Sequence, residues 1–142
     1  MRILLLLVAA LADVACFNDS LRRTMLPNGY SLDTMGRKFG IIVRPDSPRS
    51  GNFKPVWPPL NGEQERCGAF GWRDTWVVCE VVTYEHTISS KTGRFAVLNT
   101  ATGVVTLVDD RGSLTEMMRQ ASVEVPALAE DHPSTMAIYF PE

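Results

Sequence analysis

The sequence has few of the residues that catalysis or metal binding would need. Among 142 residues there are three cysteines and two histidines, and neither CxxC nor HxxxH spacing occurs. Since tetrahedral zinc needs four convergent ligands, we expect no metal site. Gly-x-Ser-x-Gly, Ser-x-x-Lys and glycine-rich phosphate-binding loops are also absent, which removes common signatures of serine acyl transfer and nucleotide binding. We therefore expect no cofactor either.

Strong charge of one sign and a long apolar run are lacking too. The formal net charge is −2, and no basic cluster is interleaved with aromatic residues, so we expect no nucleic-acid partner. The longest apolar run, residues 3–12, is too short for a membrane-spanning helix, which needs about 20 residues. With 45% apolar and 21% charged residues, the composition is that of an ordinary globular domain.

What the chain does have is an amino-terminal segment typical of an export signal. Arg2 precedes the apolar run, and small residues lead from it to Cys16. Cleavage after Ala15 would place Cys16 first, as in bacterial lipoproteins, whose terminal thiol carries a diacylglycerol. The two residues before Cys16 fit that pattern, whereas lipoproteins normally carry an aliphatic residue at the position of Asp13. Cleavage after Ala12 would instead release a secreted protein.

This segment sets the expected division of the chain. We expect residues 1–15 to be a signal peptide, residues 16–25 a polar tether, and residues 26–142 a single β-rich globular domain. A lipid on Cys16 would hold the domain in the cell envelope, on the periplasmic side of a bacterial membrane. The expected contact with the membrane is therefore a lipid anchor.

The cysteine count favours the same interpretation. If Cys16 is acylated, Cys67 and Cys79 remain to form a disulfide in an oxidising compartment. Both flank a predicted hairpin with residues 72–74 at its tip, which would place Cys67 directly opposite Cys79. The alternative is a pair of reduced, buried thiols.

Residue patterns predict an α+β, β-rich fold, an antiparallel meander of about six strands with one C-terminal amphipathic helix packed on it. Residues 75–84 are apolar at both parities, which indicates a central strand. Residues 94–99 and 104–109 flank a turn typical of a hairpin. Ser113 and Glu116 form a predicted capping box at the helix start. The helix stripe expected to face the sheet is Leu114, Met117, Met118 and Ala121.

Other segments are predicted to be irregular. The proline-rich stretch 45–62 is expected to form a loop without regular structure, and residues 85–93 a polar loop. Residues 124–134 are polar and broken by proline. The following segment, residues 135–140, is either a last strand or an exposed β-forming segment.

Three motifs resemble a known family when taken together. Residues 26–32 read LPNGYSL and follow Cys16, an aromatic-glycine strand comes later, and residues 95–103 read FAVLNTATG. This order is similar to that of small bacterial envelope lipoproteins of unknown function, which carry an LPNGY-x-L segment and a GYFILDTxTG hairpin. The resemblance covers about residues 16–119. It implies an envelope location and a small β-rich domain, and it implies no catalytic residues.

Aromatic and arginine side chains on loops are the strongest anchors of protein interfaces. We therefore expect a non-enzymatic, membrane-anchored protein that binds an unidentified envelope protein, for example as an inhibitor or immunity protein. For the proline-rich loop, burial of its aromatics over the sheet is the alternative to an exposed recognition loop. The candidate contacts are Phe53, Trp57, Trp72, Arg73 and Tyr84.

Two other functions stay open. A structural component of an envelope or virion assembly would use the β-forming tail, residues 135–140. A small-ligand-binding protein or an enzyme would use Glu85, His86 and Lys91, which are the nearest approach in the chain to an acid-base cluster.

Overall fold

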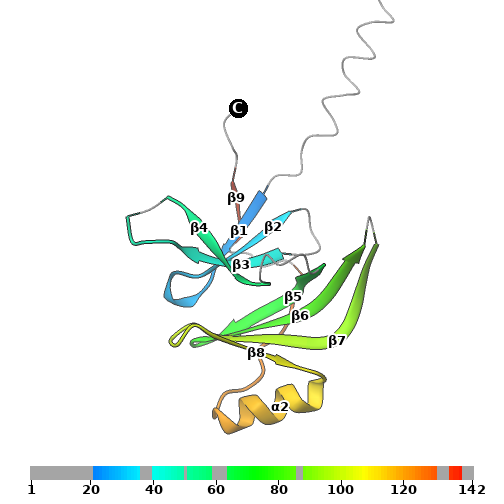
Figure 1. The fold of residues 1–142 in the computed structure, drawn as a ribbon. Coiled ribbons are helices and arrows are strands. Elements are labelled where there is room, and N and C mark those ends of the chain that lie inside the picture. The colour runs from blue at the N-terminus through cyan, green and yellow to red at the C-terminus, as the bar shows by residue number, and fades with distance from the viewer. Residues whose placement is uncertain are drawn as a thin grey trace, which may run out of the picture.

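The structure is a computed structural model that describes residues 21–35, 40–49, 51–58, 64–85, 88–130 and 135–138. The expected signal peptide, Cys16 and the first half of the tether lie outside these residues, as does His86. The described chain is a β-rich, antiparallel α+β fold with one C-terminal helix, as the sequence predicts (Figure 1).

Nine strands form one sheet among the described residues. In chain order they are β1 (Leu21–Met25), β2 (Ser31–Met35), β3 (Gly40–Pro45), β4 (Phe53–Trp57), β5 (Glu65–Arg73), β6 (Trp76–Glu85), β7 (Ile88–Asn99), β8 (Val104–Val108) and β9 (Thr135–Ile138). The order across the sheet is β8-β7-β6-β5-β3-β2-β1-β9, with β4 also paired to β3. A 3-10 turn, η2 (Pro27–Gly29), joins β1 to β2, and helix α2 (Arg111–Gln120) follows β8.

The sheet has two parts, which Figure 1 shows one above the other. β1 to β4 with β9 form the first part, β5 to β8 form the second, and the pair Gly40 and Cys67 joins β3 to β5. The larger core cluster takes side chains from both parts, so the two parts pack face to face. Its members are Leu26, Tyr30, Leu32, Ile42, Trp57, Cys67, Phe70, Val77, Cys79, Val81, Ala96 and Leu98.

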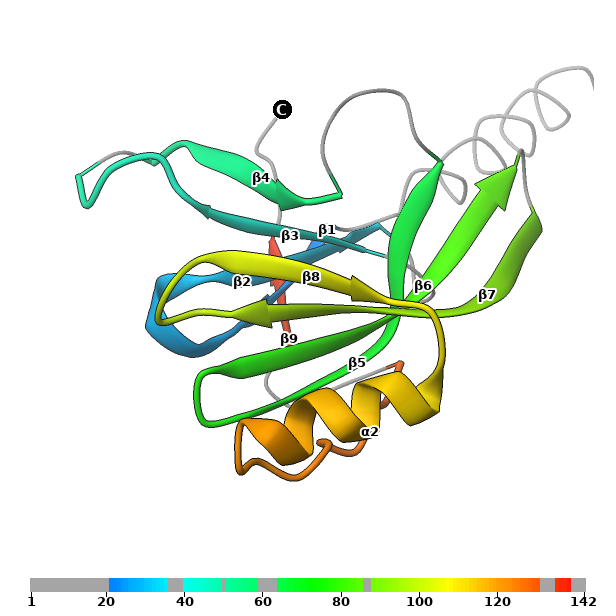
Figure 2. The ribbon, with the colours of Figure 1, turned by 60° about the horizontal axis from the view of Figure 1, so that its bottom comes forward.

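Helix α2 covers the other face of the second part, as Figure 2 shows. Leu114 and Met118 are fully buried there against Val78, Phe95 and Val97, and together they form a second core cluster. Residues 77–79 of β6 and 95–98 of β7 are therefore covered on both faces, which explains why the predicted central strand is apolar at both parities. The predicted central strand is thus confirmed, and the predicted helix stripe is confirmed for Leu114, Met117 and Met118, whereas Ala121 is the C-cap and belongs to neither core cluster.

The helix begins earlier than the capping box at Ser113 predicts. Asp110 is the N-cap, and its carboxylate accepts a hydrogen bond from the Ser113 backbone amide at 2.8 Å. Asp is a strong N-cap residue, and its charge suits the positive end of the helix dipole. Glu116 lies within the helix instead and pairs with Arg119, whose Nη2 is 2.7 Å away.

The sheet has more strands than the predicted six or so because three segments join it. β1 lies within the predicted tether, so residues 21–25 belong to the domain, between β2 and β9. β4 lies within the predicted irregular loop 45–62, and its Pro55 is tolerated because β4 is an edge strand. β9 shows that the tail segment is a last strand.

Two further loop predictions need correction. β7 begins at Ile88, so most of the predicted polar loop 85–93 is strand, paired to the end of β6. The predicted polar tail also packs, because Val123, Val125 and Leu128 cover the second core cluster. A Cβ on Gly71 would clash with the Ala127 carbonyl, so a glycine is needed where this segment crosses β5.

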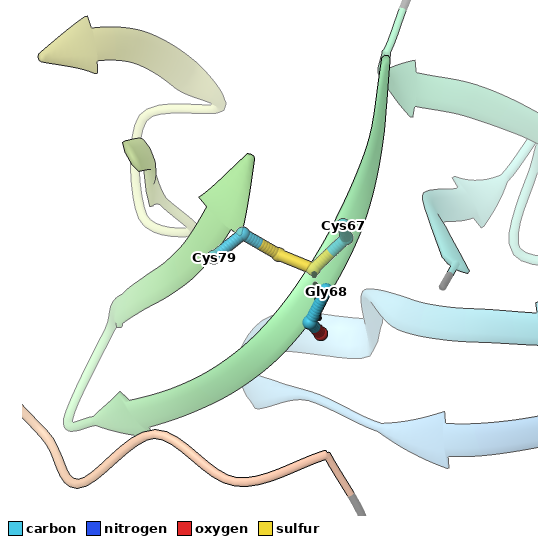
Figure 3. Close-up of a disulfide and its surroundings, with 3 residues drawn as sticks. All are labelled: Cys67, Gly68 and Cys79. Atoms are coloured by element: carbon cyan, nitrogen blue, oxygen red, sulfur yellow. Dashed lines mark hydrogen bonds between the residues drawn. A yellow bond between two sulfur atoms is a disulfide. The ribbon is translucent and has the colours of Figure 1, made fainter. Parts of the chain in front are cut away.

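The predicted disulfide joins Cys67 on β5 to Cys79 on β6 (Figure 3). Both cysteines are fully buried, and their Cα atoms are 5.4 Å apart. The two are not directly opposite, however, because Cys67 pairs with Val81 and Cys79 with Phe70. The hairpin turns at residues 74–75 rather than 72–74, and a register shift between Cys67 and Phe70 brings the cysteines together.

Candidate partner-binding surface

Two of the five predicted partner contacts lie in the proline-rich segment, and they have opposite environments. Trp57 is 4% exposed and belongs to the core between the two parts of the sheet. Phe53, four residues earlier on β4, is 36% exposed. Burial over the sheet therefore holds for Trp57, and Trp57 has almost no surface left for a partner. Phe53, in contrast, has exposed surface that a partner can contact.

Trp72 and Arg73 end β5, beside the turn to β6. Trp72 is half-buried and stacks on Phe70, with ring centroids 6.2 Å apart and an interplanar angle of 18°. Arg73 is exposed and forms an ion pair with Glu124 in the segment after the helix. Both residues thus have structural partners within the chain.

Tyr84 lies at the opposite end of the same hairpin. It is half-buried, and its backbone amide donates to the Gln64 carbonyl at 2.9 Å. β6 is ten residues long, so Tyr84 is on the order of 30 Å from Arg73. The predicted contacts therefore do not form one surface.

Phe53 belongs to a projecting element that we call the arm, residues 44–49 and 51–54. The arm comprises the end of β3, the start of β4 and the described residues between them, and Figure 2 shows it extending away from the rest of the sheet. Every described residue from 46 to 54 is exposed. The Asp46 amide donates to the Asn52 carbonyl at 2.9 Å and closes the turn. The arm is thus ordered by backbone pairing, with little side-chain burial.

One face of Phe53 rests on a cation that is itself fixed. Cζ of Arg23 on β1 lies 3.7 Å from the centroid of the Phe53 ring. Nε and Nη2 of Arg23 donate to the two Asp33 carboxylate oxygens at 2.6 and 2.7 Å. These hydrogen bonds raise the pKa of the Arg23 guanidinium above its ordinary value, against the opposing effect of burial. The exposed part of the Phe53 ring is therefore held in place.

An open groove of about 630 Å³ lies at the base of the arm. Arg44 and Lys54 occupy opposite positions on β3 and β4, and both side chains line this groove. Its other wall includes Asn28 and Thr100, where Asn28 Nδ2 donates to Thr100 Oγ1 at 2.9 Å. The LPNGY segment and the TxTG hairpin, far apart in sequence, thus meet at one site. The full lining is Asn28, Gly29, Tyr30, Arg44, Pro45, Asp46, Ser47, Pro48, Lys54 and Thr100.

Sequence reasoning missed Arg44, Lys54, Asn28 and Thr100 as site residues. Arg44 and Lys54 are cross-strand neighbours only because residues 53–57 form strand β4. The prolines in this segment predict a loop, so the sequence does not indicate that strand. Asn28 carries a signal in the Asn-Gly turn pattern, since it has a positive φ of 57°. That pattern reveals the turn and not its contact with Thr100.

Of the three residues of the possible acid-base cluster, the structure describes Glu85 and Lys91, and His86 lies outside the described residues. Lys91 Nζ lies 3.2 Å from Glu80 Oε2, and Glu85 is exposed at the end of β6. Across the described ranges, no three His, Cys, Asp or Glu side chains lie close enough to hold a metal ion. Within the same ranges, no helix has the length and apolar character to span a membrane.

Comparisons with known proteins add no homologue. No protein-family model, curated protein or solved structure matches the chain. The resemblance to envelope lipoproteins therefore rests on the sequence motifs. The function must be argued from the site itself.

Proposed function

We propose that this chain is an exported, lipid-anchored, non-enzymatic protein of the bacterial cell envelope that binds a protein partner through the arm. The exposure of the arm carries this proposal, because all its described residues from 46 to 54 face solvent. A two-stranded hairpin is marginally stable in water without apolar burial. An ordered arm with an exposed aromatic side chain is expected of an element that becomes buried when a protein partner binds.

The disulfide supports the location. Disulfides persist in oxidising compartments such as the periplasm and are rare in the cytosol. Cys67 and Cys79 are fully buried in the core, where the bridge joins two strands of the sheet. Cys16 is then the unpaired cysteine, as a lipid-carrying residue would be.

The charged side chains support a non-enzymatic role. Several that a catalytic site would use are paired with one another on the sheet or the helix. Arg94 Nη1 lies 2.7 Å from Glu65 Oε1, and Arg23 forms the bidentate pair with Asp33. These pairs hold strands together, and none of them lines the groove.

A structural role in an assembly is the second candidate, and strand β8 favours it. β8 is at one end of the strand order, and its sequence VVTLV carries no charge and no proline. Val104 is 58% exposed and Leu107 is 42% exposed. Such an edge can accept a strand from another molecule.

An intact mass measured on protein from the membrane fraction tests export and anchoring. We expect loss of residues 1–15 and the added mass of a diacylglycerol on Cys16. A chain that starts at Asp13 would contradict the lipid anchor. An unprocessed chain in the soluble fraction would contradict export.

Capture from envelope extract tests the role of the arm. We expect the wild-type chain to retain a specific protein and Phe53→Ala to lose it, because the exposed ring is removed. Ile88→Ala is the matched control, since Ile88 is 69% exposed and lies outside the arm. Equal capture by both variants would contradict partner binding through the arm.

A further inference from the structure

We propose that the groove at the base of the arm binds an acidic segment of the partner, with a carboxylate held between Arg44 and Lys54. This rests on the proposed function in that the segment belongs to a protein. It adds the site of contact and the chemistry of the ligand.

Two like charges face each other across the arm. Arg44 on β3 and Lys54 on β4 are direct cross-strand partners, and both side chains line the groove. Like charges in directly opposite positions destabilise a strand pair. This arrangement weakens the free arm, and an anion placed between the two cations removes the repulsion.

The charges of this pair are only partly neutralised within the described chain. Lys54 Nζ lies 3.3 Å from Asp46 Oδ1, and both side chains are about half exposed, so solvent weakens that ion pair. The Arg44 side chain forms no hydrogen bond or ion pair with any residue that the structure describes. Its guanidinium is available to donate two parallel hydrogen bonds to a carboxylate.

The shape of the site favours an extended segment over a membrane surface. The cations line an open groove together with the β1–β2 turn and Thr100, along which an extended segment can lie. Asp46 stands at the same groove and would repel a continuous layer of phosphates. A segment with separated carboxylates can place one at Arg44 and avoid Asp46.

The charge of the arm differs from that of the chain. The arm carries Arg44, Arg49 and Lys54 against the single carboxylate of Asp46, whereas the whole chain has a net charge of −2. The arm sums to +2 and the rest of the chain to −4, so the arm is the part with the charge that attracts an acidic partner. Charge complementarity therefore directs it to this site.

Calorimetric titration of the disulfide-bonded chain with an oligoglutamate peptide tests the proposal. We expect binding that weakens with salt, no binding of oligoglutamine, and a loss of affinity of at least about tenfold in Arg44→Gln. Lys54→Gln should lose less, because Lys54 is shared with Asp46. Arg49→Gln is the matched control, since it removes the same charge from the arm outside the groove lining.

Several results would overturn the proposal. Equal losses in Arg44→Gln and Arg49→Gln would show diffuse attraction without a site. Equal competition by inorganic phosphate would show a general anion site. Binding to vesicles of anionic lipid without binding to oligoglutamate would show a membrane contact.

Folding and partner binding are separated by two further readouts. The melting temperature of Arg44→Gln should equal or exceed that of the wild type, because the substitution removes a repulsion. A lower value would contradict the proposed arrangement. If oligoglutamate fails to bind while Phe53→Ala still abolishes partner capture, the acidic-segment proposal fails and the proposed function stands.

Discussion

Two antiparallel strand pairs of this molecule, β6 with β7 and β3 with β4, differ in what covers them. Val77 and Leu98 of the first pair lie in the core between the sheet parts, and Val78 and Val97 lie under helix α2. The second pair is buried only near Trp57, and burial ends along the arm toward Phe53. Residues 77–79 of β6 and 95–98 of β7 are thus covered on both faces, whereas the described residues 46–54 of the arm are all exposed, and Phe53 among them packs on another strand, through Arg23.

Because of this difference, the two strand pairs should contribute to different properties, one to the folding stability of the domain and the other to partner binding. Buried apolar area is the main source of folding free energy, so β6 and β7 should govern the stability of the domain. The arm adds little area and keeps a repulsive charge pair, so it should govern binding. Substitutions in β6 and β7 should therefore lower mainly the folding stability, and substitutions in the arm should lower mainly the affinity for a partner.

Phe70→Ala should have the largest effect on stability. Phe70 on β5 pairs with Cys79 of β6 and packs in the same core cluster as Val77 and Leu98, so its truncation should cost about 3–5 kcal/mol of unfolding free energy. Denaturant unfolding with a fluorescence readout measures this. Phe53→Ala is the matched control on the arm, with an expected cost below about 1 kcal/mol from the lost contact with Arg23. Similar costs for both phenylalanines would remove the contrast between the two regions.

Removal of the disulfide should have the next largest effect. Replacing both Cys67 and Cys79 with alanine should lower the unfolding free energy by about 3 kcal/mol, because the bridge restricts the unfolded chain. Thermal unfolding with and without reductant is the measurement. Reductant should shift the wild type and leave the double variant unchanged. A double variant as stable as the oxidised wild type would contradict a structural role of the bridge.

Asn28→Ala should have a moderate effect, about 1–2 kcal/mol, at the junction of the two regions. The variant loses the hydrogen bond to Thr100, and alanine is disfavoured at the positive φ of residue 28. Asn28→Gly separates the causes, since glycine accepts that backbone conformation. Chemical denaturation of both variants should place Gly between wild type and Ala. An unchanged Ala variant would show that the contact with the TxTG hairpin is unimportant.

Asp110→Ala should have the smallest effect, and it should depend on pH. Hydrogen bonds from the Ser113 backbone amide and hydroxyl hold the pKa of Asp110 below its ordinary value. A lowered carboxyl pKa stabilises the fold at neutral pH, and this contribution disappears as pH falls below about 4 through the folded-state pKa. Melting temperatures of wild type and variant should therefore differ at pH 7, and the difference should shrink as the pH falls through the folded-state pKa of Asp110. A constant difference would contradict a charged cap.

The elements that the sequence predicts well are those with local patterns. Residues 75–84 are recognised by a continuous run of apolar and β-branched residues, and the stripe with Leu114 and Met118 by its helical period. The pair Cys67 and Cys79 follows from elimination. The prediction that the two cysteines lie directly opposite each other is wrong, because the spacing of residues in the sequence does not show the register shift within β5. Local patterns therefore predict which residues are buried more reliably than which residues face each other.

The elements that the sequence conceals depend on distant partners. β1 is rich in polar residues and becomes a strand because β2 and β9 pair with it on both sides. β4 contains a proline and is a strand because β3 offers an edge. The opposition of Arg44 and Lys54 follows from that pairing alone. For this reason the candidate site could not be predicted, and the sequence could not tell which of the two loop aromatics, Phe53 or Trp57, is exposed.

Amide hydrogen exchange with and without oligoglutamate tests the separation of the two regions most directly. In the free chain, amides of residues 77–79 in β6 and 95–98 in β7 should exchange only through global unfolding, and those of the arm through local opening. The peptide should slow exchange in the arm and leave β6 and β7 unchanged. An arm as protected as β6 in the free chain, or a peptide that changes no arm amide, would contradict the account.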